Sequence, residues 1–173
     1  MKKIFLILIF ILSYSKASSE NLKFTKIANL NNPWGSSFLN DNEIIITEKG
    51  GHIKVVNIIN NQVNNLEHNL NFLEDGQGGL LDILHKENKI WISYTENRGN
   101  SKTSTSIALA NLDKKKLDFK NIFQANPPIN SGYHFGSRLA IKDNYLFASA
   151  GERGKGMIAQ DASKHPGSII RIH

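Results

Sequence analysis

Apolar and polar positions alternate in short stretches along most of this 173-residue chain, with the period of two that is typical of a half-buried β-strand. The stretches are rich in β-branched and aromatic residues, and turns that contain Asn, Asp or Gly separate them. This pattern predicts strands at residues 34–39, 43–47, 52–58, 62–66, 80–85, 90–95, 105–112, 117–124, 137–142, 145–150 and 168–172. A polar lead-in at 20–32 offers a further edge strand. No segment after the N-terminal leader keeps a helical period, so we expect an all-β fold without helices.

The predicted strands fall into three units that open in the same order. Each begins with a strand, continues through a tight polar turn, and then has a second strand with more β-branched and aromatic residues. The units start near Trp34, Leu80 and Ser137, and this spacing is close to the ~40–50 residues of a four-stranded propeller blade. An ordinary β-sandwich is the alternative, but the repeated order favours a β-propeller of about two blades plus most of a third.

A closed propeller has ~4–8 blades, which is more than this sequence supplies before it ends at His173. A partial ring would leave an unpaired sheet edge and an uncovered apolar blade face, and both promote aggregation. We therefore expect the chain to be the N-terminal portion of a longer protein or one piece of an assembly. A missing C-terminal half, or further copies in a homo-oligomer, would then complete the ring.

The N-terminus has the pattern of a signal peptide. Two lysines near the start precede an apolar run at 4–12, which is too short to span a bilayer as a helix. Small residues then occupy the positions that a signal peptidase recognises, which predicts cleavage after Ala17; an uncleaved membrane anchor is the alternative. We expect a signal peptide at 1–17 and an exported, periplasmic or secreted domain at 18–173, with no membrane attachment after cleavage. Any cofactor used there differs from the cytoplasmic nicotinamide pool.

Charge and composition exclude several classes of function. The formal net charge is +6, and three of the lysines belong to the leader, so the remaining 18 basic and 15 acidic side chains leave only +3. That excess is too small to indicate nucleic-acid binding. The sequence contains no cysteine, which excludes disulfides, thiolate catalysis and cysteine-ligated metals.

The stretch with the most chemical content carries His134 in a glycine-flanked loop before the strand at 137–142. Glu152 follows in a second glycine-containing turn, after the strand at 145–150. A strand–turn–strand pair can bring these two turns together, and a carboxylate beside an imidazole fixes its tautomer and raises its basicity, as a general base requires. A capped turn with a surface histidine is the alternative.

A cluster of glycines at 76–79, with Gln77 among them, occupies the same place in the second unit, just before its first strand. Loops at this place in a propeller gather at one end of the central channel, where ligands bind. Glycines allow the backbone to approach a ligand closely, and the Gln77 amide offers a donor and an acceptor. A tight turn with a solvated glutamine is the alternative.

These motifs together resemble the soluble aldose sugar dehydrogenases that use pyrroloquinoline quinone (PQQ), the glucose/sorbosone dehydrogenase family. The Gly-Gln-Gly-Gly-Leu-Leu-Asp and His-Phe-Gly-Ser-Arg-Leu strings are specific in combination. The matching stretches occur in the family's order at residues 33–35, 76–82, 91–94, 134–139, 151–152, 159–161 and 167–172.

The resemblance implies a six-bladed propeller whose channel mouth holds PQQ, with an aldose sugar above it. It implies that His134 takes the proton from the anomeric hydroxyl while a hydride passes to PQQ, and that Glu152 orients the imidazole. It also implies that Gln77 hydrogen-bonds PQQ. Tyr133 would line the substrate side, and we expect Arg138 to be structural, tying its loop to a neighbouring blade, in preference to binding a ligand. An external electron acceptor would then reoxidise the cofactor.

The family's cationic clamp for the PQQ carboxylates and its calcium ligands match nothing in this sequence, so neither is assigned here. None of the histidines has a metal-like spacing, and we predict no metal site. The glycine-rich basic run at 151–156 is followed by no helix that would hold a phosphate. The competing functional hypothesis is an exported propeller-type module that binds carbohydrate or protein without catalysis and without PQQ. A degenerate or truncated gene product without function is a third.

Overall fold

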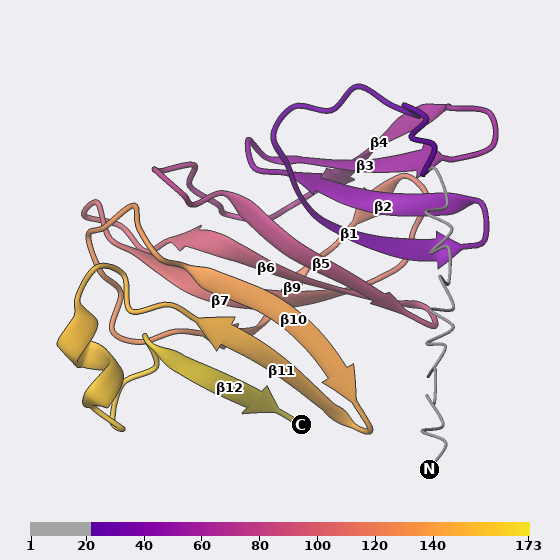
Figure 1. Cartoon of the computed structure of the whole chain (residues 1–173). Helices are drawn as coiled ribbons and strands as arrows, with labels where there is room; N and C mark the ends of the chain where they lie inside the picture. Colours follow the sequence, from indigo (N-terminus) through magenta and orange to yellow (C-terminus); the bar gives the residue numbers. More distant parts are fainter. Residues whose placement is uncertain (1–21) are drawn as a thin grey trace, which may run out of the picture.

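The computed structural model describes residues 22–173, and the predicted signal peptide at 1–17 lies outside the described residues. The described chain forms three twisted β-sheets that lie side by side in chain order (Figure 1). The first strands of the three sheets, β1 (Pro33–Asn40), β5 (Leu80–Lys86) and β10 (Gly136–Lys142), are neighbours in space. This is the radial arrangement of propeller blades around their innermost strands.

The first sheet is an antiparallel meander of β1, β2 (Glu43–Glu48), β3 (His52–Asn57) and β4 (Val63–His68). The second sheet contains β5, β6 (Lys89–Asn97), β7 (Thr103–Asn111) and β9 (Lys120–Gln124) in that order. The third contains β10, β11 (Tyr145–Ala150) and β12 (Ser168–Ile172). The predicted strands are confirmed to within two residues, apart from the one at 117–124.

The predicted strand at 117–124 is wrong as a single element, because the chain changes sheets inside it. The two-residue strand β8 (Lys116–Leu117) pairs in parallel with β4 and extends the first sheet, whereas β9 joins the second. Between them, the Asn69 side chain accepts a hydrogen bond from the Phe119 N–H at 2.8 Å and donates to the Phe119 carbonyl at 3.2 Å. Leu117 and Phe119 are both buried in the core between the sheets, which fixes the crossing point.

Two further expectations are corrected. Residues 22–32 form no strand, so the described part of the predicted edge strand at 20–32 is wrong. A short 3-10 helix, η1 (Gly156–Gln160), lies in the long loop between β11 and β12, where no helix was expected. No helix within residues 22–173 is long and apolar enough to cross a membrane.

Apolar side chains pack between neighbouring sheets in two clusters. The larger lies between the first and second sheets and includes Ile45, Ile53, Leu80, Ile92 and Leu117. The smaller lies between the second and third sheets and is centred on buried residues Ile107, Leu146 and Ala148. β5, the first strand of the second sheet, therefore packs against a neighbouring sheet on each side. This explains why its first four residues are all buried.

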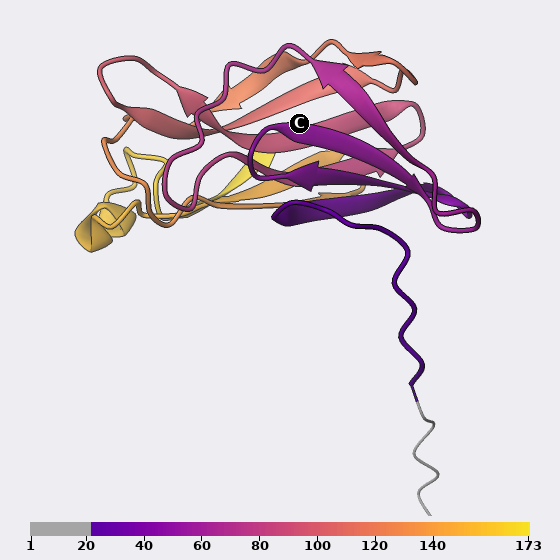
Figure 2. The same cartoon turned by 90° about the horizontal axis from the view of Figure 1, so that it is seen from above.

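Buried polar side chains also join the sheets. The Thr47 hydroxyl donates to the Leu81 carbonyl of β5 at 2.5 Å, and the Thr105 hydroxyl of β7 donates to the Phe135 carbonyl at 2.8 Å. These bonds fix the relative height of the sheets. As a result, the loops that precede β5 and β10 and the turn that follows β11 all lie at one end of the molecule (Figures 1 and 2, left).

Candidate active site

The loop before β5 and the loop before β10 lie directly against each other. The Gln77 N–H donates to the Gly132 carbonyl at 2.7 Å, and the Gly151 N–H donates to the Phe135 carbonyl at 3.0 Å. The second bond brings the turn after β11 against the His134 loop. Three segments that are far apart in sequence thus form one continuous surface.

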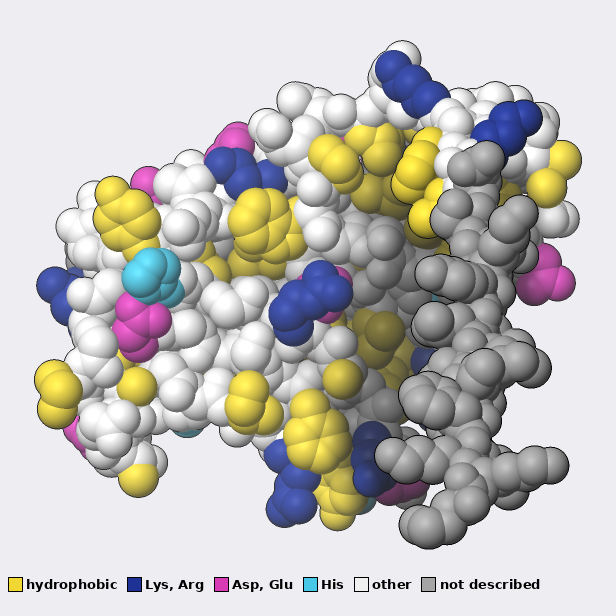
Figure 3. Space-filling model, viewed as in Figure 1, with side chains coloured by type: hydrophobic (Ala, Val, Ile, Leu, Met, Phe, Trp, Pro, Cys, Tyr) yellow, Lys and Arg dark blue, Asp and Glu magenta, His cyan; other side chains and the backbone are white. Residues whose placement is uncertain are grey.

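His134 and Glu152 face each other on this surface. Nδ1 of His134 is hydrogen-bonded to Oε1 of Glu152, which also accepts from the Gly154 N–H at 3.1 Å. The hydrogen bond from His134 is the main reason that the pKa of the Glu152 carboxyl lies below its ordinary value. The side chain of His134 is 53% exposed, and Figure 3 shows cyan histidine and magenta acidic atoms side by side on this open face.

This geometry leaves the second ring nitrogen of His134 free to act as a base. A carboxylate at Nδ1 holds the proton on that nitrogen, so Nε2 carries the lone pair. Nε2 forms no hydrogen bond with any residue in the range 22–173 that the structure describes. An imidazole with an oriented tautomer and an open acceptor nitrogen meets the geometric requirement for proton abstraction from a bound hydroxyl.

The backbone around His134 is tightly constrained. His134 has a φ of 49°, in the left-handed region that side chains with a Cβ atom disfavour. Oε1 of Gln77 accepts a hydrogen bond from the His134 N–H at 2.9 Å. A Cβ atom on residue 151 would lie 1.8 Å from the His134 carbonyl oxygen, so only glycine fits there. Gln77 and Gly151 therefore fix the backbone of His134, at its N–H and at its carbonyl.

Gln77 thus uses its carbonyl oxygen to support His134. Its side-chain NH2 has no hydrogen-bond partner among the described residues, and the residue is exposed. The glycines around it have a different role from the expected one. Added Cβ atoms on Gly78 and Gly79 would meet protein atoms, Thr95 Oγ1 at 2.4 Å and the Lys49 carbonyl oxygen at 2.1 Å. Close packing within the protein accounts for these two glycines.

Tyr133 and Arg138 lie on either side of His134 in the sequence. Tyr133 is 61% exposed, and its ring lies edge-on to that of His134 with a centroid separation of 6.2 Å. Nη1 of Arg138 lies 3.3 Å from Oδ1 of Asp82 on β5, while the rest of its side chain is open to solvent. Arg138 therefore contacts the neighbouring sheet and presents its remaining N–H groups outward. Figure 3 shows Lys and Arg side chains scattered over this face, without a single basic patch.

Arg153 is a residue of this site that the sequence did not single out. It appeared only as part of a glycine-rich basic run, yet it is buried beneath the His134 loop with 2% of its surface exposed. The one feature of the sequence that could have pointed to a role in the site is its position directly after Glu152.

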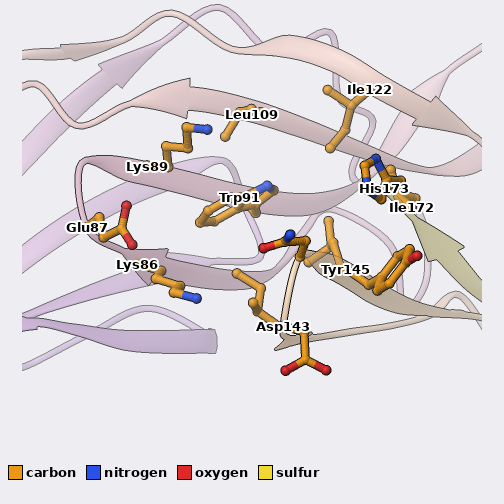
Figure 4. Close-up of a pocket in the computed structure, with 13 residues that line it drawn as sticks. Lys86, Glu87, Lys89, Trp91, Leu109, Ile122, Asp143, Tyr145, Ile172 and His173 are labelled. Atoms are coloured by element: carbon orange, nitrogen blue, oxygen red, sulfur yellow. The ribbon is translucent and has the colours of Figure 1, made fainter.

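A separate hollow of about 350 Å³ lies between the second and third sheets, at the opposite ends of β5 and β10 (Figure 4). Its lining includes Trp91, Tyr145 and His173, together with parts of the turn between β5 and β6 and of the turn between β10 and β11. It contains none of the predicted site residues. The candidate site is the open loop surface around His134, not this hollow.

Comparison with known proteins agrees with the motif resemblance. The family model described as Glucose / Sorbosone dehydrogenase matches residues 30–173. The chain belongs to the glucose/sorbosone dehydrogenase family. The match spans nearly all of the described chain, which confirms the resemblance at the level of the family.

Individual relatives support the same assignment. The chain is 32% identical over 153 residues to the aldose sugar dehydrogenase YliI of Escherichia coli, covering 83% of this chain and 41% of that protein. It matches the structure of the soluble aldose sugar dehydrogenase of Escherichia coli in its apo form with a TM-score of 0.78 at 32% identity, covering 83% of this chain and 44% of that one. This confirms the all-β fold of a propeller portion.

A more distant structure shares the fold. The aldose sugar dehydrogenase of Streptomyces coelicolor, solved in its PQQ-bound form, matches with a TM-score of 0.76 at 22% identity, covering 86% of this chain and 46% of that one. The chain therefore spans less than half the length of the relatives that it matches.

Proposed function

We propose that this chain carries the catalytic base of an oxidoreductase that oxidises the anomeric hydroxyl of aldose sugars and uses PQQ as the hydride acceptor. The observation that carries the proposal is the His134–Glu152 pair, with its hydrogen bond at Nδ1 and its open Nε2. Membership of the glucose/sorbosone dehydrogenase family supports the reaction class.

The exposed groups around His134 fit the reacting side of PQQ and a sugar. The free NH2 of Gln77 can donate to a quinone or hydroxyl oxygen, and Tyr133 offers an exposed ring beside the imidazole. Two cations of the neighbouring loops are already engaged, since Lys49 donates to the Gly76 carbonyl at 2.7 Å and Arg153 is buried. We propose that the cationic partners of the PQQ carboxylates come from outside the described residues, from further chain or from another copy.

The chain's own residues account for the proton transfer. Nε2 of His134 accepts the proton of the anomeric hydroxyl as the C1–H bond breaks, and the sugar leaves as a lactone. Glu152 stabilises the resulting imidazolium through the Nδ1–H bond, and Gln77 keeps the loop carbonyls and His134 in register. PQQ, when bound, supplies the quinone that takes up the hydride, and an external acceptor then removes the electrons.

The signal-peptide pattern at the N-terminus supports a proposal for where the reaction takes place. We propose that residues 1–17 direct export to the periplasm or beyond and are cleaved after Ala17. Mass spectrometry of the protein purified from its source checks this: a mature N-terminus at Ser18 is expected, and a retained leader contradicts it.

The decisive experiment is a dye-linked aldose oxidation assay with and without added PQQ, on the wild-type protein and the His134→Ala variant. We expect PQQ-dependent oxidation in the wild type and a loss of about 10²–10⁴-fold in kcat for the variant, because general base catalysis contributes that much. PQQ binding, followed by its absorbance, should persist in the variant.

The matched control is His52→Ala, which removes an exposed histidine from β3 in the first sheet and should leave kcat unchanged. Near-normal activity of His134→Ala would show that the base is assigned wrongly. Carbohydrate binding with no oxidation and no dependence on PQQ would favour a binding module instead.

A further inference from the structure

Arg153 is the one buried basic residue within residues 22–173, and its surroundings are unusual for a cation. No carboxylate oxygen of the described residues lies within 4.0 Å of its guanidinium. A buried charge without an ion-pair partner is costly and is normally found only where several hydrogen bonds compensate for it. The residues that Arg153 contacts therefore indicate which part of the structure its burial stabilises.

Four hydrogen bonds, all to neutral oxygens, satisfy the guanidinium. Nε donates to the Tyr133 carbonyl at 2.9 Å, and Nη2 donates to the Ser131 carbonyl. On the other side, Nη1 donates to the Thr103 carbonyl at 3.2 Å and Nη2 to the Thr103 hydroxyl at 2.7 Å. One planar group thus ties the loop before β10 to the first residue of β7.

The face of the guanidinium is also occupied. Its Cζ atom lies 3.6 Å from the centroid of the Phe135 ring, within the range of a cation–π contact. Burial lowers the pKa of Arg153 to about 10, partly opposed by Asp75, so the side chain remains cationic at neutral pH. The hydrogen bonds and the ring contact together hold residues 131, 133 and 135.

His134 lies between two of the residues that Arg153 contacts, Tyr133 and Phe135. Arg153 also follows Glu152 directly, with a φ of 59° that turns the chain sharply at that point. A single buried side chain therefore fixes both members of the pair: it anchors the loop that carries His134 and the turn that carries Glu152. Neither His134 nor Glu152 touches the guanidinium through its own side chain in any hydrogen bond of the described residues.

We infer that Arg153 is the positioning residue of the His134–Glu152 pair, and that its planar fork is what keeps Glu152 against Nδ1 of the imidazole. This role rests on the proposed function only in taking His134 as the base. Lysine cannot replace it, because an ammonium group has no planar array of five N–H donors and does not stack on a ring in the same way.

The test compares Arg153→Lys with the wild type by NMR, in the absence of sugar and PQQ. In the wild type, ring ¹⁵N shifts should report a single neutral tautomer of His134 protonated at Nδ1, and carboxyl ¹³C shifts should report a Glu152 pKa below its ordinary value. In Arg153→Lys we expect a mixture of tautomers and a Glu152 pKa that returns toward the ordinary value.

Two further variants make the outcome decisive. Arg171→Lys is the matched control, because Arg171 also lies over an aromatic ring, that of Tyr145 at 4.9 Å, but on β12; it should leave both signals unchanged. Should Arg153→Lys fail to fold, Thr103→Val removes one acceptor of the guanidinium and touches neither member of the pair. It should shift the same signals in the same direction by a smaller amount.

Kinetics add an independent readout. In the sugar oxidation assay, Arg153→Lys should lower kcat by about 100-fold with little change in KM, since misplacement of a catalytic group by about 1 Å costs that much. Unchanged NMR signals in Arg153→Lys, or in Thr103→Val where the first variant does not fold, would overturn the inference. A wild-type protein with the expected signals but no sugar oxidation would refute the proposed function and leave the role of Arg153 intact.

Discussion

His134, Ser137 and Arg153 all have a positive φ, at 49°, 80° and 59°, and all three lie in or beside the candidate site. For residues with a Cβ atom, this region costs roughly 1–2 kcal/mol each. Other residues with a positive φ, such as Glu87 and Asp143, lie in the tight turns between strands. Strain that the surrounding hydrogen bonds hold in place at a candidate site is typical of a preorganised functional group.

Gly151→Ala tests this constraint at one atom. The added Cβ would lie 1.8 Å from the His134 carbonyl, so the His134 loop must move away from Glu152. We expect at least a 100-fold loss of kcat in the proposed sugar oxidation and loss of the single His134 tautomer in the NMR spectrum. Gly156→Ala is the control, because no atom lies within 4 Å of its added Cβ. Equal activity in the two variants would contradict the tight packing of Gly151 against the His134 carbonyl.

A buried carboxylate on β2 fixes the segment that leads into the first sheet. Glu48, at the end of β2, accepts a hydrogen bond from the Asn31 N–H at 2.6 Å and lies 2.9 Å from Nζ of Lys54 on β3. Burial alone would raise the pKa of Glu48, but the Asn31 N–H and the Lys54 ammonium outweigh it and hold the pKa below its ordinary value of 4.5. The segment before β1 is thus tied to the sheet by charge.

The lowered pKa of Glu48 makes the free energy of unfolding depend on pH. A carboxyl whose pKa is lower in the folded state stabilises the protein above its ordinary pKa, and the stabilisation disappears as the pH falls through the folded value. At pH 7 we expect Glu48→Gln to lower the free energy of unfolding by about 1–3 kcal/mol. The difference from the wild type should shrink steadily below pH 4.5. Urea unfolding at pH 7 and pH 3 measures it.

Glu67→Gln, on the exposed face of β4, is the control for this comparison and should change the free energy of unfolding by less than about 0.5 kcal/mol at either pH. A difference between Glu48→Gln and wild type that persists at pH 3 would mean that packing, and not charge, holds the segment.

The second and third sheets of the molecule meet through a buried carboxylate. Oδ2 of Asp82 on β5 accepts a hydrogen bond from the Leu139 N–H of β10 at 2.8 Å, and Oδ1 lies 3.3 Å from Arg138. The Ser93 hydroxyl donates to the Ser137 carbonyl at 2.5 Å beside it. The register of β10 against β5, and with it the place of the His134 loop, depends on these contacts.

Asp82→Ala should therefore affect stability and the site together. The Leu139 N–H loses its acceptor in a largely buried interface, which costs about 1–3 kcal/mol in the free energy of unfolding. Urea unfolding and amide hydrogen exchange at Leu139 measure the effect, and exchange there should accelerate. Asp41→Ala, in the exposed turn between β1 and β2, should change neither. Unaltered exchange at Leu139 would show that Asp82 does not set the register.

The sequence alone determined the strands and turns, because these depend on residues that are close together in the chain. Alternation of apolar and polar positions placed most strands to within two residues, because which face a strand buries is a local property of period two. Turn residues placed the hairpins, and the His134 and Gly76–Gly79 motifs carried the family resemblance that the comparisons confirm.

The tertiary structure decided what depends on residues far apart in the chain. The crossing near Phe119 depends on Asn69, and the burial of Arg153 depends on Thr103, fifty residues upstream. No periodicity encodes such pairs. The sequence pattern therefore predicted a single strand where the chain changes sheets, and it showed Arg153 only as part of a basic run. Gln77 likewise gained its bond to His134 only when two sheets packed together, because local sequence specifies elements whereas packing specifies which of their ends meet.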